Sequence, residues 1–368
     1  MTKTNIIDYL YWRGDLSFDE SPFNEIDNLI LSNLCYVRFT GIIKDNYEKI
    51  TISRAATDFL KQEEALRITR TEYDIEFLKI LMNTRRFGNL HIFKHRELYS
   101  KDDDIQFGAI SIMINPKLCY ISYRGTDNFI GGWKEDLDMS YSIVPSQTMA
   151  LDYLREIIKD TDKGIRFMVG GHSKGGNLAM FACAFLSNHE FARIERIYNN
   201  DGPGFDFGVM PKERFSRLLG ILVTYTPKTS IVASFFEQPG ELTFIESCEK
   251  NLMSHDPYTW IADVTHFVYL DDTDGLSKNF KNRFDQWINS LSYNERKHVI
   301  ETLYDIILKI NINTLSDIIP SLINNYGVVI SMLTKTDEKT GRAIKSAINV
   351  ILSTVASNLD DKTRRLFK

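Results

Sequence analysis

Residues 166–179 read RFMVGGHSKGGNLA, and the pentapeptide at 171–175 fits the pattern G-x-S-x-G. This pattern is typical of a nucleophile elbow, in which a serine lies on a tight turn between a strand and a helix. The apolar run before the turn predicts a strand, and apolar residues at three- and four-residue steps after it predict a helix. We therefore expect Ser173 at the carboxyl end of a buried strand and at the amino terminus of a helix.

Small residues are required on both sides of such a serine. Side chains at positions 171 and 175 would collide with neighbouring backbone, and Gly176 allows the helix to approach the sheet closely. The serine itself is expected to hold a strained backbone conformation. The backbone N–H of Lys174 and the positive end of the helix can then stabilise an oxyanion. A glycine-rich turn without catalytic chemistry is the alternative interpretation.

The region around this turn alternates between short apolar runs and helical patterns. Continuous apolar strands separated by helices are typical of an α/β protein with a parallel sheet covered on both faces. The first two strands are expected to form a hairpin around Asn115-Pro116. The predicted strands are residues 107–114, 118–123, 166–169, 194–198, 221–225, 242–245 and a late addition at 267–270.

Helical patterns flank this central zone on both sides. Residues 65–87 give the clearest helix before it, and 343–355 form an amphipathic stretch after it. Residues 292–295 (SYNE) are a capping-box signature for a further helix. We expect a helical N-terminal extension (1–95), an α/β domain (96–277) and a helical C-terminal region (278–368). The helical flanks either pack on the central domain or offer a surface to a protein partner.

Composition excludes several classes of protein. The 368 residues include 44 Lys and Arg against 49 Asp and Glu, a net charge of −5, so a nucleic-acid partner is not expected. No apolar run reaches the ~18–20 residues of a transmembrane segment, and the first residues do not resemble a secretory signal. The four cysteines are widely spaced, without metal-ligand spacing, and read as free thiols. The sequence thus predicts a cytoplasmic protein.

A serine nucleophile requires a base, and neutral imidazole suits that role near pH 7. In proteins whose serine lies on a nucleophile elbow of this kind, the chain order is serine, acid, histidine. Only His255, His266 and His298 lie far enough along the chain to be the base. His298 lies inside an amphipathic helical pattern, and His266 begins the late strand. His255 lies just after the strand at 242–245, where the fold places its base. We predict His255, with His266 as the alternative.

Several motifs resemble those of a known family. The elbow at 171–179 resembles that of the class 3, or fungal-type, lipases. The most similar family is the Mbeg1-like family of lipase-like proteins, and the resemblance covers roughly residues 100–272. It implies an α/β-hydrolase fold with helical additions at both ends. The further motifs are YRGT at 123–126, Trp133 with Asp136-Leu137, DGPGF at 201–205 and HDP at 255–257.

The resemblance also bears on the acid of the catalytic triad. In class 3 lipases the acid follows the strand that corresponds to 221–225, and the aligned position here is Ser230, which cannot carry the charge. Asp201, at the end of the preceding strand, is predicted instead, because some α/β-hydrolases place their acid there. Its alternative role is to start the Asp-Gly-Pro-Gly turn. Asp256 and Asp263 are the other candidates.

The second donor of the oxyanion hole is assigned by the resemblance to Thr126. Its backbone N–H, together with its hydroxyl, would complement the N–H of Lys174. Arg124 and Asp127 are expected to form a structural ion pair nearby, and Asp136 to hold the same loop.

These residues predict a serine hydrolase that cleaves a carboxylic ester or thioester through an acyl-enzyme. Ser173 attacks, His255 accepts the proton, Asp201 orients His255, and the Lys174 and Thr126 amides hold the oxyanion; no metal or cofactor is required. A lipid substrate is implied by the resemblance alone. Because a fold does not establish chemistry and the usual lipase acid is replaced, a non-catalytic binding or scaffold protein is the second hypothesis. A peptidase is the third.

Overall fold

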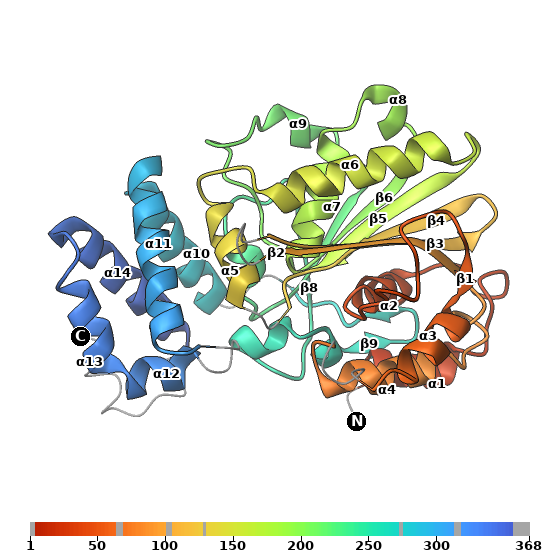
Figure 1. Cartoon of the computed structure of the whole chain (residues 1–368), viewed down its shortest axis with the longest axis horizontal. Helices are drawn as coiled ribbons and strands as arrows, with labels where there is room; N and C mark the ends of the chain where they lie inside the picture. Colours follow the sequence, from red (N-terminus) through yellow and green to blue (C-terminus); the bar gives the residue numbers. More distant parts are fainter. Residues whose placement is uncertain are drawn as a thin grey trace.

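The computed structural model describes residues 4–63, 69–100, 105–127, 130–271, 275–312 and 318–355. An eight-stranded sheet runs through its centre, with the strands in chain order from β1 to β8 (Figure 1). The first four strands pair antiparallel, and β4 to β8 pair parallel. The strands are β1 (Ile50–Thr51), β2 (His91–Ser100), β3 (Ile105–Asn115), β4 (Leu118–Tyr123), β5 (Arg166–His172), β6 (Ile194–Asn200), β7 (Leu222–Pro227) and β8 (Leu242–Ile245).

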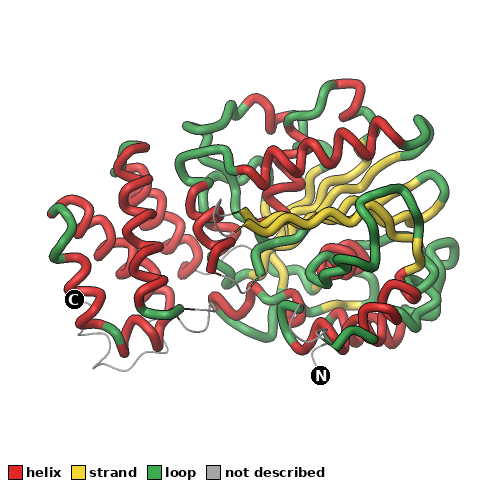
Figure 2. Tube along the Cα trace, in the orientation of Figure 1, coloured by secondary structure: helices red, strands yellow, loops and turns green. Residues whose placement is uncertain are grey.

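Helices cover both faces of the sheet (Figures 1 and 2). Two apolar cores result, because neighbouring strand residues point to opposite faces: Ile121 belongs to the core under α6 and α7, and Tyr120 to the core under the N-terminal helices. This is the α/β-hydrolase arrangement that the sequence predicts. The helices are α6 (Pro145–Asp160) and α7 (Lys174–Ala184) on one face, α1 (Ile6–Arg13), α2 (Glu25–Leu34), α3 (Ile52–Leu60) and α4 (Glu72–Leu81) on the other, and the short α8 (Asn188–Phe191) and α9 (Glu213–Ser216).

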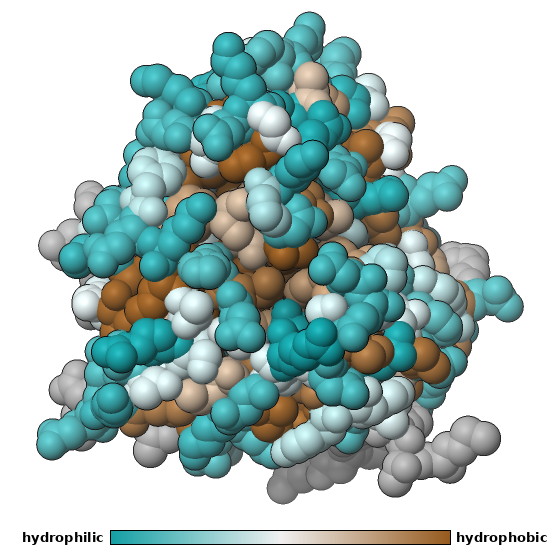
Figure 3. Space-filling view, turned by 90° about the vertical axis from the view of Figure 1, so that its right-hand side faces the viewer, coloured by the Kyte–Doolittle hydropathy of each residue, from teal (hydrophilic) through white to brown (hydrophobic). Residues whose placement is uncertain are grey.

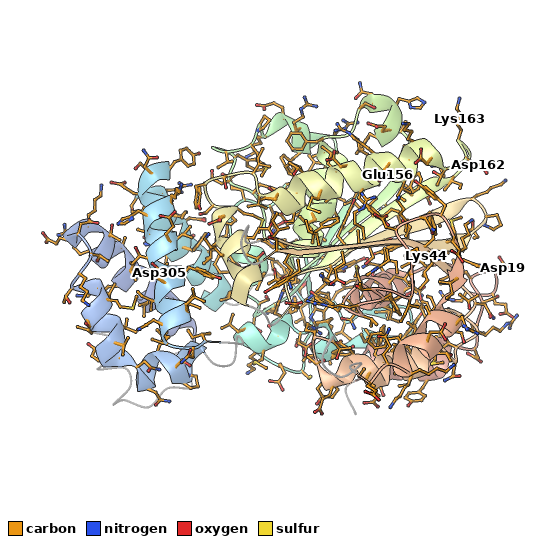
Figure 4. The ribbon with its side chains drawn as sticks, viewed as in Figure 1. Asp19, Lys44, Glu156, Asp162, Lys163 and Asp305 are labelled. Atoms are coloured by element: carbon orange, nitrogen blue, oxygen red, sulfur yellow. The ribbon has the colours of Figure 1, made fainter. Side chains whose placement is uncertain are left out.

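The N-terminal part is less helical than expected. Strands β1 and β2 both join the sheet, and β2 crosses residue 95. The charged residues of β2 obscure the alternating apolar pattern of a strand. One of them, Lys94, is nevertheless buried, because its Nζ pairs at 2.7 Å with Glu156 on α6 (Figure 4). The helix expected over 65–87 is α4, which ends at Leu81; residues 65–68 lie outside the described residues.

The C-terminal helices form a separate group at the left of Figure 1, with an apolar core of their own. The predicted capping box is confirmed: Glu295 accepts from the Ser292 N–H at 2.8 Å at the start of α11. The end of the molecule farthest from these helices presents apolar patches between hydrophilic side chains (Figure 3). The helices are α10 (Gly275–Asn289), α11 (Tyr293–Lys309), α12 (Ile318–Asn324), α13 (Tyr326–Leu333) and α14 (Glu338–Val355).

Short elements connect the sheet to these helices. The strand expected at 267–270 is only partly formed, since β10 covers two residues and pairs with β9 instead of extending the main sheet; Tyr269 makes one bridge to Ile245. None of the helices in the described ranges has the length and apolar character required to cross a membrane. The short elements are η2 (Val232–Ser234), η3 (Asn251–His255), η4 (Pro257–Thr259), β9 (Ala262–Asp263) and β10 (His266–Phe267).

Candidate functional site

Ser173 lies at the turn between β5 and α7, where the sequence predicts it. Its φ of 59° and ψ of −134° lie in a region that is costly for a residue with a side chain. Its N–H donates to the Asn200 carbonyl at 2.9 Å, which fixes the turn against the end of β6. The end of β4 passes so close that a Cβ at Gly171 would lie 2.6 Å from the Tyr123 carbonyl oxygen, and one at Gly175 only 2.1 Å. Both glycines are therefore required sterically.

His255 and Asp201 are in direct contact, although 54 residues separate them. Nδ1 of His255 lies 2.7 Å from Oδ2 of Asp201. Because a carboxylate only accepts, Nδ1 carries the proton and Nε2 of the neutral ring keeps its lone pair. Asp201 is fully buried, and His255 is 8% exposed. The pair thus has the geometry of a base and the acid that orients it.

Two hydroxyl groups complete the surroundings of the Asp201 carboxylate. Thr226 donates to Oδ1 at 2.6 Å, and Ser230 donates to Oδ2 at 2.5 Å. Ser230 is the position where the resemblance places the lipase acid. Here the Ser230 hydroxyl supports the Asp201 carboxylate, which comes from the end of the neighbouring strand β6. Positions 201 and 230 are therefore in direct contact. Asp201 holds a positive φ of 54°, which Asp tolerates better than most residues.

Ser173 and His255 are not hydrogen-bonded in this conformation. Within the described residues, the Ser173 hydroxyl and Nε2 of His255 have no hydrogen-bond partner. The two residues belong to adjoining segments, because the ring of His172 lies 4.5 Å from the ring of His255, centroid to centroid. Catalytic hydrogen bonds are often long without a substrate and tighten when it binds.

His172, immediately before the serine, holds the segment that carries His255. Its Nε2 lies 2.8 Å from the His255 carbonyl oxygen, so Nε2 must be the donor; its Nδ1 then accepts from the Tyr36 hydroxyl at 2.9 Å. Burial, reinforced by His255 and Arg70, lowers the pKa of His172 well below its ordinary value. The ring therefore stays neutral and places no charge beside His255. Sequence reasoning missed Tyr36, whose partner lies 136 residues away.

A second contact from the N-terminal segment reaches the residue after His255. Arg70 binds Asp256 at 3.2 Å, and its guanidinium lies 4.6 Å from the centre of the Tyr36 ring. Tyr258 accepts from Asn33 at 2.8 Å in the same region. The N-terminal segment thus holds the backbone immediately after the imidazole.

The alternative histidines and acids have other partners. Nδ1 of His266 contacts the Phe267 carbonyl at 2.9 Å, and the His266 ring stacks on Tyr269. Asp256 is engaged by Arg70, and Asp263 is an exposed residue of β9. His298 is exposed and lies 3.6 Å from Asp337. The structure brings only His255 and Asp201 together as an acid–imidazole pair among these candidates.

Two backbone N–H groups are available next to Ser173. Within the described part of the chain, the N–H groups of Lys174 and Thr126 have no hydrogen-bond acceptor. A Cβ at Gly125 would lie 3.0 Å from the Ser173 Cβ, so the loop after β4 passes beside the serine. The Thr126 hydroxyl, however, donates to Asp136 at 2.6 Å. Its single proton is therefore committed, and the backbone N–H is the donor that Thr126 can offer.

The side chain of Lys174 ties this turn to α5 (Ile130–Asp138). Its buried ammonium donates to Glu135 and to the Gln106 carbonyl, both at 2.9 Å. Asp136, which binds Thr126, lies 3.6 Å from the same ammonium. Burial raises the pKa of the Asp136 carboxyl, and the Lys174 charge opposes that shift. Helix α5 thus orders both segments that carry the two free N–H groups.

The ion pair expected between Arg124 and Asp127 is not the one that forms. Arg124 pairs with Glu97 at 2.6 Å, and Asp127 pairs with Arg38 at 2.5 Å. Both partners come from segments before residue 100, which the sequence did not connect with this loop. Among the described residues, no group of His, Cys, Asp and Glu side chains is arranged to hold a metal ion.

One family model and several solved structures are similar to this chain. The sequence model of the Mbeg1-like family matches residues 81–305. No curated protein matches the chain.

Three solved lipases resemble the fold at low identity. The M37 lipase is 16% identical, with 56% of this chain and 69% of that chain covered and a TM-score of 0.36. The Lip2 lipase of Yarrowia lipolytica is 13% identical over 60% and 77%, with a TM-score of 0.35. The Rhizomucor miehei lipase in its propeptide complex is 18% identical, with 42% of this chain covered and a TM-score of 0.30. This chain spans 57% of the length of that lipase.

Proposed function

The chain belongs to the Mbeg1-like family, and from this premise and the geometry of the site we propose that it is a serine esterase of the lipase type. Its substrate is a carboxylic ester or thioester, and the reaction passes through an acyl-enzyme at Ser173. The observation that carries the proposal is the buried pair of Asp201 and His255, joined at 2.7 Å beside a serine in a strained turn.

The first half of the proposed reaction acylates the enzyme. The Ser173 oxygen attacks the acyl carbonyl while Nε2 of His255 removes its proton. The carbonyl oxygen becomes an oxyanion, which the N–H groups of Lys174 and Thr126 stabilise. When the intermediate collapses, the bond to the leaving group breaks, and His255 donates its proton to the departing alkoxide or thiolate.

The second half releases the acid. A water molecule gives a proton to His255 and attacks the acyl carbon. When the second tetrahedral intermediate collapses, the bond to the Ser173 oxygen breaks, His255 returns the proton to that oxygen, and the free carboxylic acid leaves. Asp201 stabilises the imidazolium formed in both halves. Because Thr226 and Ser230 already donate to this carboxylate, it is held in one orientation without rearrangement.

We propose the cytoplasm as the compartment of this enzyme. The four cysteines are free in the structure, and Cys35, Cys119 and Cys183 are buried. Burial raises the pKa of the Cys35 and Cys119 thiols to about 12, so they are unreactive packing groups. Free thiols are typical of proteins in a reducing compartment.

Labelling with a fluorophosphonate probe tests the proposal. Such a probe forms a bond to an activated serine oxygen and loses fluoride, so we expect labelling of the intact chain at Ser173, located by peptide mass spectrometry. Ser173→Ala should abolish labelling, and Ser216→Ala, at an exposed serine in α9, should leave it unchanged. Labelling that survives Ser173→Ala, or that is absent from the folded wild type, would overturn the proposal in favour of a non-catalytic role.

A further inference from the structure

A cavity lies between α10 and α14 in the C-terminal helical group. Its volume is about 520 Å³, within the range of small-molecule sites. It is open to solvent, and none of the proposed catalytic residues lines it. Its lining residues are Arg283, Gln286, Trp287, Ser290, Leu291, Lys339, Arg342, Ala343 and Ser346.

Each helix contributes one face to the cavity. Positions 283, 286, 287 and 290 recur at three- and four-residue steps on α10, as do 339, 342, 343 and 346 on α14. The indole N–H of Trp287 donates to the Ala343 carbonyl at 2.9 Å and joins the two faces. Trp287, Leu291 and Ala343 supply an apolar floor between them.

The charges of the cavity are of one sign. Arg283, Lys339 and Arg342 line it, and no Asp or Glu does, in a chain whose net charge is −5. Arg342 pairs with Glu338 at 3.2 Å, and Lys339 pairs with Glu295, but both pairs are exposed. Exposed ion pairs contribute little to stability, so a bound anion can replace them. The described residues provide no carboxylate partner for Arg283.

We propose that this cavity binds an amphipathic anion, a carboxylate or phosphate carried by an apolar chain. The planar guanidinium groups of Arg283 and Arg342 suit the oxygens of either headgroup, and Lys339 adds a third charge. The apolar chain lies on Trp287 and its neighbours. This binding site goes beyond the proposed esterase function, because it uses none of the residues around Ser173.

Isothermal titration calorimetry on the full chain tests the site. The Ser173→Ala variant is used, so that the result does not depend on turnover. Dodecanoate and dodecyl phosphate, each below its micelle concentration, should bind with similar affinity. Dodecanol and inorganic phosphate should each bind at least about tenfold more weakly, since each lacks one half of the recognised chemistry. Equal binding of dodecanol, or no binding of either anion, would overturn the proposal.

Substitutions then locate the bound anion. Arg283→Gln and Arg342→Gln should each weaken dodecanoate binding about tenfold, the effect of one charge-assisted hydrogen bond. Lys345→Gln is the matched control, because Lys345 is an exposed cation of α14 that does not line the cavity. Circular dichroism confirms folding of each variant. Unchanged affinity in both arginine variants would place the ligand elsewhere, for instance beside residue 173, and would refute this site while leaving the esterase proposal intact.

Discussion

The two helical flanks differ in how they join the sheet. Among its described residues, the N-terminal segment has no core of its own: Leu29 and Phe59 belong to the same apolar cluster as Tyr120 and Trp260 of the central domain. The C-terminal helices have a separate core, in which Val299 and Ile344 take part. One flank is therefore built into the central domain, and the other packs against it.

Polar contacts show the same contrast. On the N-terminal side, Arg86 and Asp27 form an ion pair in which both side chains are fully buried. On the C-terminal side, Arg296 of α11 binds Asp206 and the Ser140 carbonyl, and Phe284 of α10 packs on Phe235 at 4.8 Å. The N-terminal ion pair lies in the interior of the central domain. The C-terminal contacts join the surface of the helical group to the surface of that domain.

The largest expected effect concerns the loop that the N-terminal segment holds in place. His255→Ala should lower kcat/KM on a short-chain aryl ester by about 10⁴-fold or more, because the serine loses its base. His266→Ala is the matched control and should change the rate less than about threefold, since its ring is exposed and stacks on Tyr269. Inactivity of the His266 variant alone would show that the base has been assigned to the wrong loop.

Removing one buried arginine from each flank should separate the two kinds of attachment. Arg86→Met leaves Asp27 charged and unpaired in the interior, and should lower the free energy of unfolding by about 3–5 kcal/mol. Arg296→Met should cost less, about 1–3 kcal/mol, because the C-terminal helices keep their own core. Urea denaturation measures both.

Hydrogen exchange locates the helices and strands that each substitution destabilises. The Arg296 variant should exchange faster in α10–α14 only, whereas the Arg86 variant should exchange faster in β5 and β6 as well. Equal, molecule-wide acceleration in both variants would contradict the distinction between the flanks.

The smallest expected effect tests the contact between the N-terminal segment and His172. Tyr36→Phe removes the donor to Nδ1 of His172 and should lower kcat about fivefold with little change in KM, the cost of one neutral hydrogen bond. His172→Asn, whose amide can still donate to the His255 carbonyl, should retain more activity than His172→Ala. If Tyr36→Phe and both His172 variants match the wild type, the contact serves packing alone.

Much of the fold follows from local sequence signals. Strands β4 and β8 occupy the residues predicted for them, because each is a short apolar run bounded by turns. Strand β2 was missed because its charged residues are satisfied by distant partners, such as Glu156 for Lys94. Helix α4 ends before the predicted boundary because the chain must turn to bring Arg86 onto Asp27.

The site was predictable to a different degree at each residue. The position of Ser173 follows from glycines whose steric role is local. His255 and Asp201 were proposed from chain order and strand ends, and their contact at 2.7 Å depends on how the strands align in space. The roles of Tyr36 and Arg70 had no local signal, because their partners lie 136 and 186 residues further along the chain.

The hydroxyl of Ser230 on the Asp201 carboxylate has a consequence for how members of this family diverge. The end of β6 supplies the carboxylate that contacts His255, and the segment after β7 supplies a hydroxyl to that carboxylate. The charge can therefore move from one position to the other during evolution while His255 stays in place. Relatives that appear to have lost their acid at the β7 position should be checked for a carboxylate after β6 before they are classed as inactive. In this chain, a reciprocal exchange of residues 201 and 230 would retrace that step.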